Sequence, residues 1–267
     1  MALPCRLEPA GARPLVGAGR DVHHGRMSLR HAFAPVVDLV YPPRCPACGE
    51  GLAAQDGLCG PCWGTLAIPG DPSCSLCARP FPDAALDDGA VCAPCLADPP
   101  RHDGIAAATI YGDISRRLVL AFKHGRRIAL APMLARMMAA RLPVLEGDWL
   151  VVPVPLHWSR LWRRGYNQSA LLAGELARHS GQRLLVDALV RRKPTRPLGG
   201  LGRQARARVL SGAIAARPAR MAELRGRDIV LVDDVLTSGA TSRACVAALK
   251  RAGARKVVIA CFARVLD

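Results

Sequence analysis

Aromatic residues are scarce in this chain. Phe, Trp and Tyr make up 4% of its 267 residues, whereas hydrophobic residues as a whole make up 51%. A core built from Ala, Val and Leu suits an α/β protein better than an aromatic-rich β-sandwich. The sequence also shows no aromatic ladder on which the bases of single-stranded nucleic acid would stack.

Long apolar segments are missing as well. No run of about 18 or more apolar residues is present, so the sequence predicts no membrane insertion. The first residues also lack the combination of a charged start, an apolar stretch and a small-residue cleavage site that marks a secretory signal. We therefore expect a soluble, cytoplasmic protein, in which thiols stay reduced and paired cysteines indicate metal binding rather than disulfides.

Acidic residues are few in the C-terminal two thirds. Lys and Arg outnumber Asp and Glu by 30 to 11 in residues 101–267, whereas acids prevail by 8 to 2 in residues 36–100 and residues 1–35 hold 5 basic and 2 acidic residues. A strongly basic domain is typical of proteins whose partner is rich in phosphate, either nucleic acid or a polyphosphate metabolite. The alternative is that the arginines form a solvated surface and reflect genome composition.

Changes of pattern divide the chain into three segments. Residues 1–35 are expected to be a disordered extension leading into a short helix at Ser28–Leu39, and Met27 is an alternative translation start. Residues 36–100 hold too few apolar residues to form a core unaided, so metal is expected to replace one. Residues 101–267 alternate between strand and helix patterns and are predicted to form the main domain.

Eight of the eleven cysteines form C-x-x-C pairs. Such a turn directs two thiolates at one metal ion, and a second pair completes a tetrahedral Cys₄ site that leaves no open position for substrate. We therefore predict a double zinc ribbon with two structural zinc ions, held by consecutive or by interleaved pairs; iron–sulfur binding is the rival. The predicted ligands are Cys45, Cys48, Cys59, Cys62, Cys74, Cys77, Cys92 and Cys95.

Apolar periodicity predicts the elements of the main domain, and a βαβ unit at its end implies a mostly parallel sheet with right-handed crossover. The expected strands are Ile105–Tyr111, Trp149–Pro153, Asp228–Val232 and Lys256–Ala263. The expected helices are Ile114–Phe122, Ala129–Arg141, Gln168–Ser180 and Thr241–Ala252, the last two stopped by Gly181 and Gly253.

The segment DIVLVDDVLTSGAT places two acids and a small-residue turn between a strand and a helix. Gly239 permits close approach of a ligand, and the following helix N-terminus favours a phosphate group. Because Asp233 and Asp234 would repel phosphate, we expect them to face ribose hydroxyls and a magnesium ion. The alternative is an ordinary strand–turn–helix junction in which acids and hydroxyls merely cap the helix.

This segment resembles the phosphoribosyl-pyrophosphate (PRPP) signature of the type I phosphoribosyltransferases, in which a hydrophobic run and two acids precede T-[ST]-G-[AG]-T. The resemblance implies that Asp233 and Asp234 are the catalytic pair, holding the ribose 2′- and 3′-hydroxyls. It also implies a loop that wraps the 5′-phosphate, formed by Thr237, Ser238, Gly239, Ala240 and Thr241.

Further pieces occur in order: PPRCPACG, AFKHG, VPVPLHWSRLWRRGYNQS and a loop from Thr195 to Arg208. Together they resemble the ComF family, phosphoribosyltransferase-like proteins with a double zinc ribbon that are linked to DNA uptake in competent bacteria. The resemblance implies a set of residues on the pyrophosphate and acceptor side of PRPP: Lys123, Arg163, Arg164, Asn167, Gln168, Arg206 and Arg208.

The chain departs from this pattern at two positions. Leu198 stands where relatives commonly have Gln, and Val209 where they have Asn. Both changes remove a polar group, so the acceptor, or transfer itself, is where this chain is expected to differ. His124 and His157 have no visible partner and are not assigned a catalytic role.

Three functions compete at this stage. The first is an enzyme that binds PRPP with Mg²⁺ and transfers its phosphoribosyl group to an unidentified acceptor. The second is a non-catalytic competence factor, in which the basic segment holds single-stranded DNA and passes it to a helicase. The third is a scaffold protein in which the phosphate loop is a relic.

Overall fold

A computed structural model describes residues 42–55, 57–82, 89–123, 127–193 and 212–266. Contacts divide the chain after Pro42, and residues 43–267 form one compact unit. The predicted extension and the helix at Ser28–Leu39 lie outside the described residues. No helix in the described ranges is long and apolar enough to cross a membrane.

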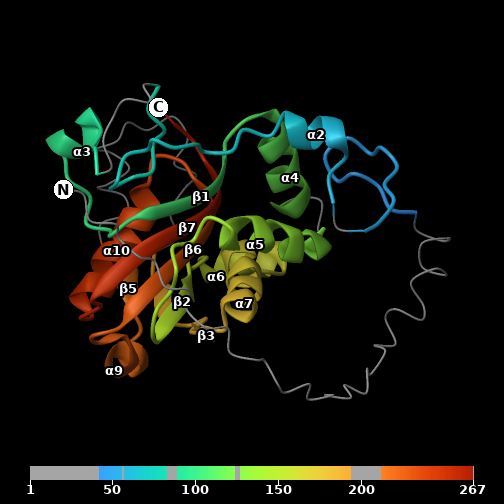
Figure 1. Cartoon of the computed structure of the whole chain (residues 1–267). Helices are drawn as coiled ribbons and strands as arrows, with labels where there is room; N and C mark the ends of the chain where they lie inside the picture. The colour runs from blue at the N-terminus through green and yellow to red at the C-terminus, as the bar shows by residue number, and fades with distance from the viewer. Residues whose placement is uncertain (1–41, 56, 83–88, 124–126, 194–211, 267) are drawn as a thin grey trace, which may run out of the picture. The chain divides into compact units, whose positions relative to one another are not determined.

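A five-stranded, entirely parallel sheet organises the C-terminal part of the chain (Figure 1). Its spatial order is β1-β7-β6-β2-β3. The strands are β1 (Ile105–Ile110), β2 (Trp149–Pro153), β3 (Arg183–Leu184), β6 (Asp228–Leu236) and β7 (Lys256–Arg264). The near-continuous Val, Ile and Ala runs of β6 and β7 fit a sheet that is buried on both faces, and the predicted parallel sheet is confirmed.

Helices connect the strands and cover both faces of the sheet. The helices of the main domain are α4 (Asp113–Lys123), η1 (Ile128–Leu130), α5 (Ala131–Ala139), α6 (Trp158–Arg164), α7 (Gln168–Ser180), η2 (Pro218–Arg220), α9 (Met221–Leu224) and α10 (Ala240–Arg251). The bounds of β2 and α7 match the prediction, and Gly181 and Gly253 both adopt a positive φ directly after or just beyond their helices. The predicted helix at Ala129–Arg141 is instead a short 3₁₀ turn followed by α5.

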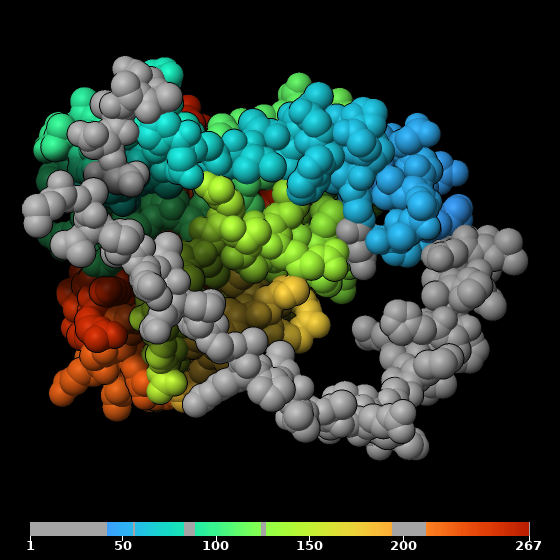
Figure 2. All heavy atoms as spheres, in the orientation of Figure 1, coloured from blue at the N-terminus to red at the C-terminus, as the bar shows by residue number. Residues whose placement is uncertain are grey.

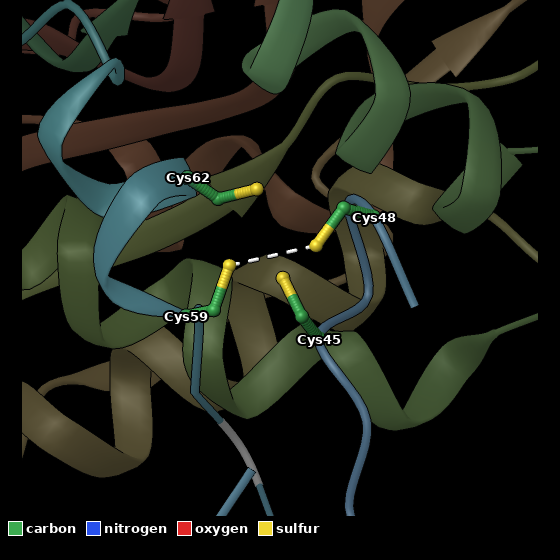
Figure 3. Close-up of side chains that lie close together, drawn as sticks. All are labelled: Cys45, Cys48, Cys59 and Cys62. Atoms are coloured by element: carbon green, nitrogen blue, oxygen red, sulfur yellow. Dashed lines mark hydrogen bonds between the residues drawn. The ribbon is translucent and has the colours of Figure 1, made fainter. Parts of the chain in front are cut away.

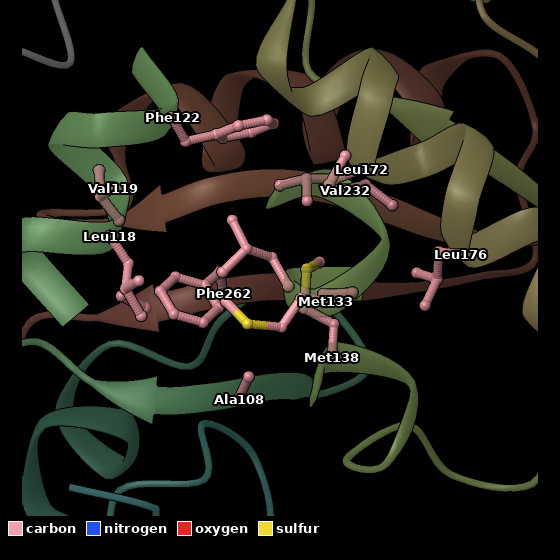
Figure 4. Packing of buried hydrophobic residues seen from close by; sticks show 14 of the residues in the cluster. Ala108, Leu118, Val119, Phe122, Met133, Met138, Leu172, Leu176, Val232 and Phe262 are labelled. Carbon is pink, nitrogen blue, oxygen red and sulfur yellow. The ribbon is translucent and has the colours of Figure 1, made fainter. Parts of the chain in front are cut away.

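One face of the sheet packs against α4, α5 and α7 (Figure 4). Phe122, Leu172 and Phe262 are among its buried side chains. The other face packs against α10, where Leu249 lies among residues of β2, β6 and β7. An antiparallel hairpin, β4 (Leu189–Arg191) and β5 (Ile214–Ala216), contacts α10 on this second face.

Two cysteine-rich segments precede the sheet and contain the short helices α2 (Gly60–Gly64) and α3 (Ala93–Ala97). The first segment joins the core of the α4–α5 face through Cys62 and Leu66. Figure 2 shows the blue and cyan atoms of the cysteine-rich segments lying against green atoms of the main domain. The backbone N–H of Ile110 donates to Ala67 O at 2.7 Å, which extends this contact to the end of β1. The second segment packs against Ile105 at the start of the same strand.

Candidate functional site

The cysteines gather into two Cys₄ clusters, and each cluster is built from consecutive C-x-x-C pairs. The ligands are Cys45, Cys48, Cys59 and Cys62 in the first and Cys74, Cys77, Cys92 and Cys95 in the second. In Figure 3 the four thiols of the first cluster point toward a common centre. The structure therefore selects consecutive pairing over interleaved pairing.

The clusters fit zinc. Within each, all four sulfur atoms lie within 4.8 Å of one another, and the Sγ–Sγ distances are 3.5 Å for Cys48–Cys59 and 3.6 Å for Cys77–Cys92. Four thiolates at a Zn–S distance of about 2.3 Å in a tetrahedron would be about 3.8 Å apart. Four cysteines leave no position for substrate, so these are structural sites.

The first cysteine of each cluster receives backbone N–H donors. Although burial opposes it, these donors lower the pKa of Cys45 to about 6 and that of Cys74 to about 6. The N–H of Cys92 donates to Cys74 Sγ at 3.3 Å. A thiolate that is stabilised by backbone donors is prepared to bind a metal cation.

The acid pair lies on β6 rather than beyond it. The predicted end of this strand at Val232 is wrong, because β6 continues to Leu236 through pairing with β7. Asp233 pairs in register with Cys261 on that neighbour. The extra pairing fixes both carboxylates at the carboxyl edge of the sheet, where α/β proteins bind ligands.

The two carboxylates have different partners. Lys123 Nζ, at the end of α4, lies 2.9 Å from Asp234 Oδ2, and the N–H of Val235 donates to Asp234 Oδ1 at 2.7 Å. Asp233 Oδ1 accepts from Ser169 Oγ at 3.0 Å and from the backbone N–H of Asp234 at 2.9 Å. The pair is therefore held rigidly by three different elements.

Burial, followed by the negative charge of Asp234, raises the pKa of Asp233 to about 7, although Lys123 opposes the shift. The carboxyl group of Asp233 therefore titrates near neutral pH. A ligand that favours the ionised carboxylate, such as a cation or a hydroxyl donor, would be bound more tightly above that pH than below it.

The predicted phosphate loop connects β6 to α10 over residues 237–239. Gly239 adopts φ +68°, and a Cβ there would meet nothing closer than 3.9 Å, so the left-handed backbone rather than space favours glycine. No side chain caps the N-terminus of α10, which begins at Ala240. Backbone N–H groups at such an end form an anion-binding site.

Helix α7 begins beside the acid pair. Asn167 caps it by accepting from the N–H of Ser169 at 3.0 Å and anchors it by donating from Nδ2 to Val154 O at 3.0 Å. Gln168 is buried and accepts from Arg164 at 2.8 Å, while its own Nε2 is buried without a hydrogen-bond partner in the part of the chain that the structure describes. Buried donors of this kind usually await a partner.

Other predicted residues stand apart from this arrangement. Arg163 is exposed on α6, and the described residues give it no hydrogen bond or ion pair. Arg206 and Arg208 lie outside the described residues, as do His124, Leu198 and Val209. His157 caps α6 and is buried, which supports a structural role.

The sequence did not single out Ser169 or Arg191. Ser169 Oγ donates a hydrogen bond to Asp233 Oδ1. The apolar periodicity of α7 and its Asn cap were the sequence signals that could have identified this serine. Arg191 is 7% exposed at the end of β4, where burial and then the charge of Arg160 lower its pKa while Asp233 raises it. No pattern in the sequence distinguishes this arginine from its neighbours.

Comparisons with known proteins agree with this architecture. The sequence profile of the family described as "Double zinc ribbon domain" matches residues 36–99, and that described as "Phosphoribosyl transferase domain" matches residues 167–267. "DNA utilization protein YhgH" of Escherichia coli K12 is 31% identical over 236 residues, covering 85% of this chain and 100% of that protein. "Competence protein F" of Haemophilus influenzae is 30% identical over 228 residues, covering 83% and 96%.

Among solved structures, this chain is similar to a glutamine PRPP amidotransferase from B. subtilis, with 22% identity and a TM-score of 0.33. The alignment covers 48% of this chain and 25% of the amidotransferase chain. That value is too low to add information on function.

The parallel sheet, the acid pair with its loop and the two Cys₄ clusters define a type I phosphoribosyltransferase-like protein with an N-terminal double zinc ribbon. The chain belongs to the ComF family, whose members named above are linked to competence and DNA utilization.

Proposed function

We propose that the chain binds PRPP with Mg²⁺ and transfers the phosphoribosyl group to an acceptor. The observation that carries the proposal is the acid pair of β6, in which Asp234 is buried and Asp233 is partly accessible. Asp233 and Asp234 are fixed at the carboxyl edge of the sheet by Ser169 and Lys123, immediately before an uncapped helix.

Each group has a task in this proposal. The carboxylates of Asp233 and Asp234 accept hydrogen bonds from the ribose hydroxyls, and the backbone N–H groups of residues 237–241 bind the 5′-phosphate. Gln168, Arg164 and Lys123 face the pyrophosphate, whose departure from C1 leaves positive charge on the sugar ring. The acceptor forms the new bond to C1 and loses its proton.

Carboxylate oxygens are the ligand type that Mg²⁺ prefers, so Asp233 and Asp234 fit a magnesium ion that arrives with PRPP. Bound there, the ion would neutralise the pyrophosphate charge. Lys123 already holds Asp234, which keeps that carboxylate oriented while the ligand enters. The predicted cytoplasmic location agrees with access to PRPP.

Mass spectrometry with isotopically labelled PRPP tests transfer. The zinc-loaded chain is incubated with PRPP, Mg²⁺ and either a metabolite extract or nucleic acid, and labelled adducts are sought. A labelled adduct formed by the wild type and by Asp148→Asn, an exposed acid outside the site, but not by Asp233→Asn/Asp234→Asn, supports the proposal. Label that stays in PRPP and its hydrolysis products contradicts transfer.

A second candidate function, binding of single-stranded DNA before a competence helicase receives it, is favoured by one surface. Helix α6 exposes Trp158 and Trp162, which are 67% and 84% accessible and four residues apart, with Arg163 beside them. Residues 149–174 contain no acid. Aromatic side chains stack on bases and arginines contact phosphates, so this helix offers the platform that the composition did not reveal.

Fluorescence anisotropy of a labelled single-stranded oligonucleotide tests this surface. We expect binding that weakens with salt and is lost in Trp158→Ala/Trp162→Ala. Trp63→Ala is the control, because Trp63 is also exposed, at 51%, but lies on α2. Binding that survives the double substitution would show that DNA contacts another surface.

A further inference from the structure

Arg264 ends the central strand β7, and its side chain is buried. Only 8% of the residue is exposed, and its Nη1 atom has no hydrogen-bond partner within the described ranges. The backbone of Arg264 pairs with Leu236 on β6 and with Ile110 on β1. Since Leu236 immediately precedes the phosphate loop, the orphaned guanidinium belongs to the edge of the sheet where that loop begins.

A second arginine contacts the phosphate loop, and the charges of both arginines act on a histidine. Arg243, in the first turn of α10, donates from Nη2 to Ser238 O of the phosphate loop at 2.8 Å. His102 has a buried Nδ1 without a partner among the described residues. Burial, then the charges of Arg264 and Arg243, lower the pKa of His102 to about 4.

In the part of the chain that the structure describes, no acid forms an ion pair with Arg264. Asp103 is the acid that acts on His102, but its Oδ2 accepts from Lys250 Nζ and from the N–H of Val257, each at 2.7 Å. The charge of Arg264 also acts on the buried thiol of Cys261, which forms a cluster with Ala107 and Leu236.

A buried cation without a partner is costly, because its lost hydration is not replaced. A leucine or methionine at the end of β7 would fill the same place without that cost. Retaining arginine here therefore indicates a ligand that supplies the missing negative charge, as at other sites where buried polar groups lack a partner in the free protein.

We propose that Arg264 and Arg243 form an anion-binding subsite beside the phosphate loop, which takes a phosphate or carboxylate group other than the 5′-phosphate of PRPP. The guanidinium of Arg264 binds the anion, and Arg243 couples the subsite to the loop through Ser238. If the proposed transfer is correct, the subsite selects an acceptor that carries such an oxyanion. Only this selection rests on the proposed function.

Thermal unfolding of the zinc-loaded full chain tests the subsite with inorganic phosphate as the probe. Saturating ribose 5-phosphate is added first, so that the loop is occupied. We expect added phosphate to raise the melting temperature of the wild type but not that of Arg264→Met. The control is Arg251→Met, which should respond like the wild type because Arg251 is exposed at the end of α10, the helix that carries Arg243. The dissociation constant of Arg264→Met for phosphate should be about tenfold higher than that of the wild type, or more.

Stability without ligand gives an independent readout. Replacing an unpaired buried cation by an apolar side chain is expected to leave the free protein as stable or more stable. Arg264→Met that loses stability and keeps the phosphate response would overturn the proposal, since the arginine would then be structural. If that variant does not fold, Arg264→Lys and titration of the wild-type His102 by NMR replace it.

The NMR measurement has a definite sign. An anion at the subsite stabilises the imidazolium form, so phosphate should raise the pKa of His102. An unchanged His102 titration overturns the proposal. Acetate and succinate in place of phosphate distinguish a carboxylate ligand from a phosphate ligand.

Failure of the subsite and failure of the PRPP proposal are distinguishable. If ribose 5-phosphate and PRPP do not bind, the phosphate response that depends on Arg264 is still measurable in their absence. If Arg264→Met instead abolishes PRPP binding itself, the guanidinium belongs to the PRPP site and the separate subsite is refuted.

Discussion

Asp233→Asn is expected to make the free protein more stable while removing its affinity for PRPP. Asparagine keeps the shape of the side chain, and its Oδ1 can still accept from Ser169 Oγ and from the N–H of Asp234. It removes only the ionisable group, whose pKa is raised from 3.8 to about 7 by burial and by Asp234.

The sign and size follow from proton binding. A raised carboxyl pKa means that the native state binds the proton more tightly than the unfolded chain, so stability falls as the pH rises from about 4 to about 7 and is then constant. A shift of about three units corresponds to roughly 4 kcal/mol at most. Because Asp233 is partly accessible, we expect a gain of roughly 2–4 kcal/mol in Asp233→Asn at pH 8, shrinking as the pH falls.

Urea unfolding of the zinc-loaded chain at several pH values between 5.5 and 8.5 measures the difference. Asp148→Asn is the control, since this acid is 89% exposed and its variant should show no comparable change with pH. If Asp233→Asn is less stable than the wild type at pH 8, or if the difference does not change with pH, then the raised pKa of Asp233 does not destabilise the free protein.

Three further predictions concern the metal, the loop and the cation. Cys77→Ser should lower the zinc content from two ions to one per chain and lower the melting temperature by several degrees, as measured by metal analysis and calorimetry, whereas Cys245→Ser, on α10 and outside both clusters, should leave the zinc content at two ions. Gly239→Ala, at φ +68°, should lower the free energy of unfolding in urea by about 1–2 kcal/mol. Gly174→Ala, with the same 3.9 Å clearance but no positive φ, should be neutral or stabilising. Equal effects of the two substitutions would show that the positive φ is not the cause. Lys123→Met should raise the pKa of Asp233 further, so the pH at which PRPP–Mg²⁺ affinity reaches half its maximum should move upward, and an unchanged profile would contradict the role of this lysine.

Local patterns predicted much of the fold. The apolar run of β2 and the capped, Gly-terminated pattern of α7 were sufficient to place both elements, because each is decided mainly by neighbouring residues. The two zinc sites followed from C-x-x-C spacing, but their pairing did not, since consecutive and interleaved arrangements use the same turns. Only the three-dimensional structure separates them.

Features that depend on distant contacts were not predictable. The extension of β6 through the acids depends on pairing with β7, which offsets the poor strand preference of Asp. Arg191 and Arg264 are buried because the sheet and hairpin end around them, while the other arginines of the described ranges are partly or fully exposed. The exposure of Trp158 and Trp162 likewise depends on helix α6, which the sequence reading did not separate from its loop.

Calorimetric titration of the zinc-loaded chain with PRPP in the presence of Mg²⁺ measures whether the acid pair binds this ligand. We expect saturable binding of one PRPP per chain, unchanged in Asp148→Asn and absent in Asp233→Ala/Asp234→Ala. No binding by the wild type, or equal binding by the wild type and the double variant, would contradict a PRPP site at this acid pair.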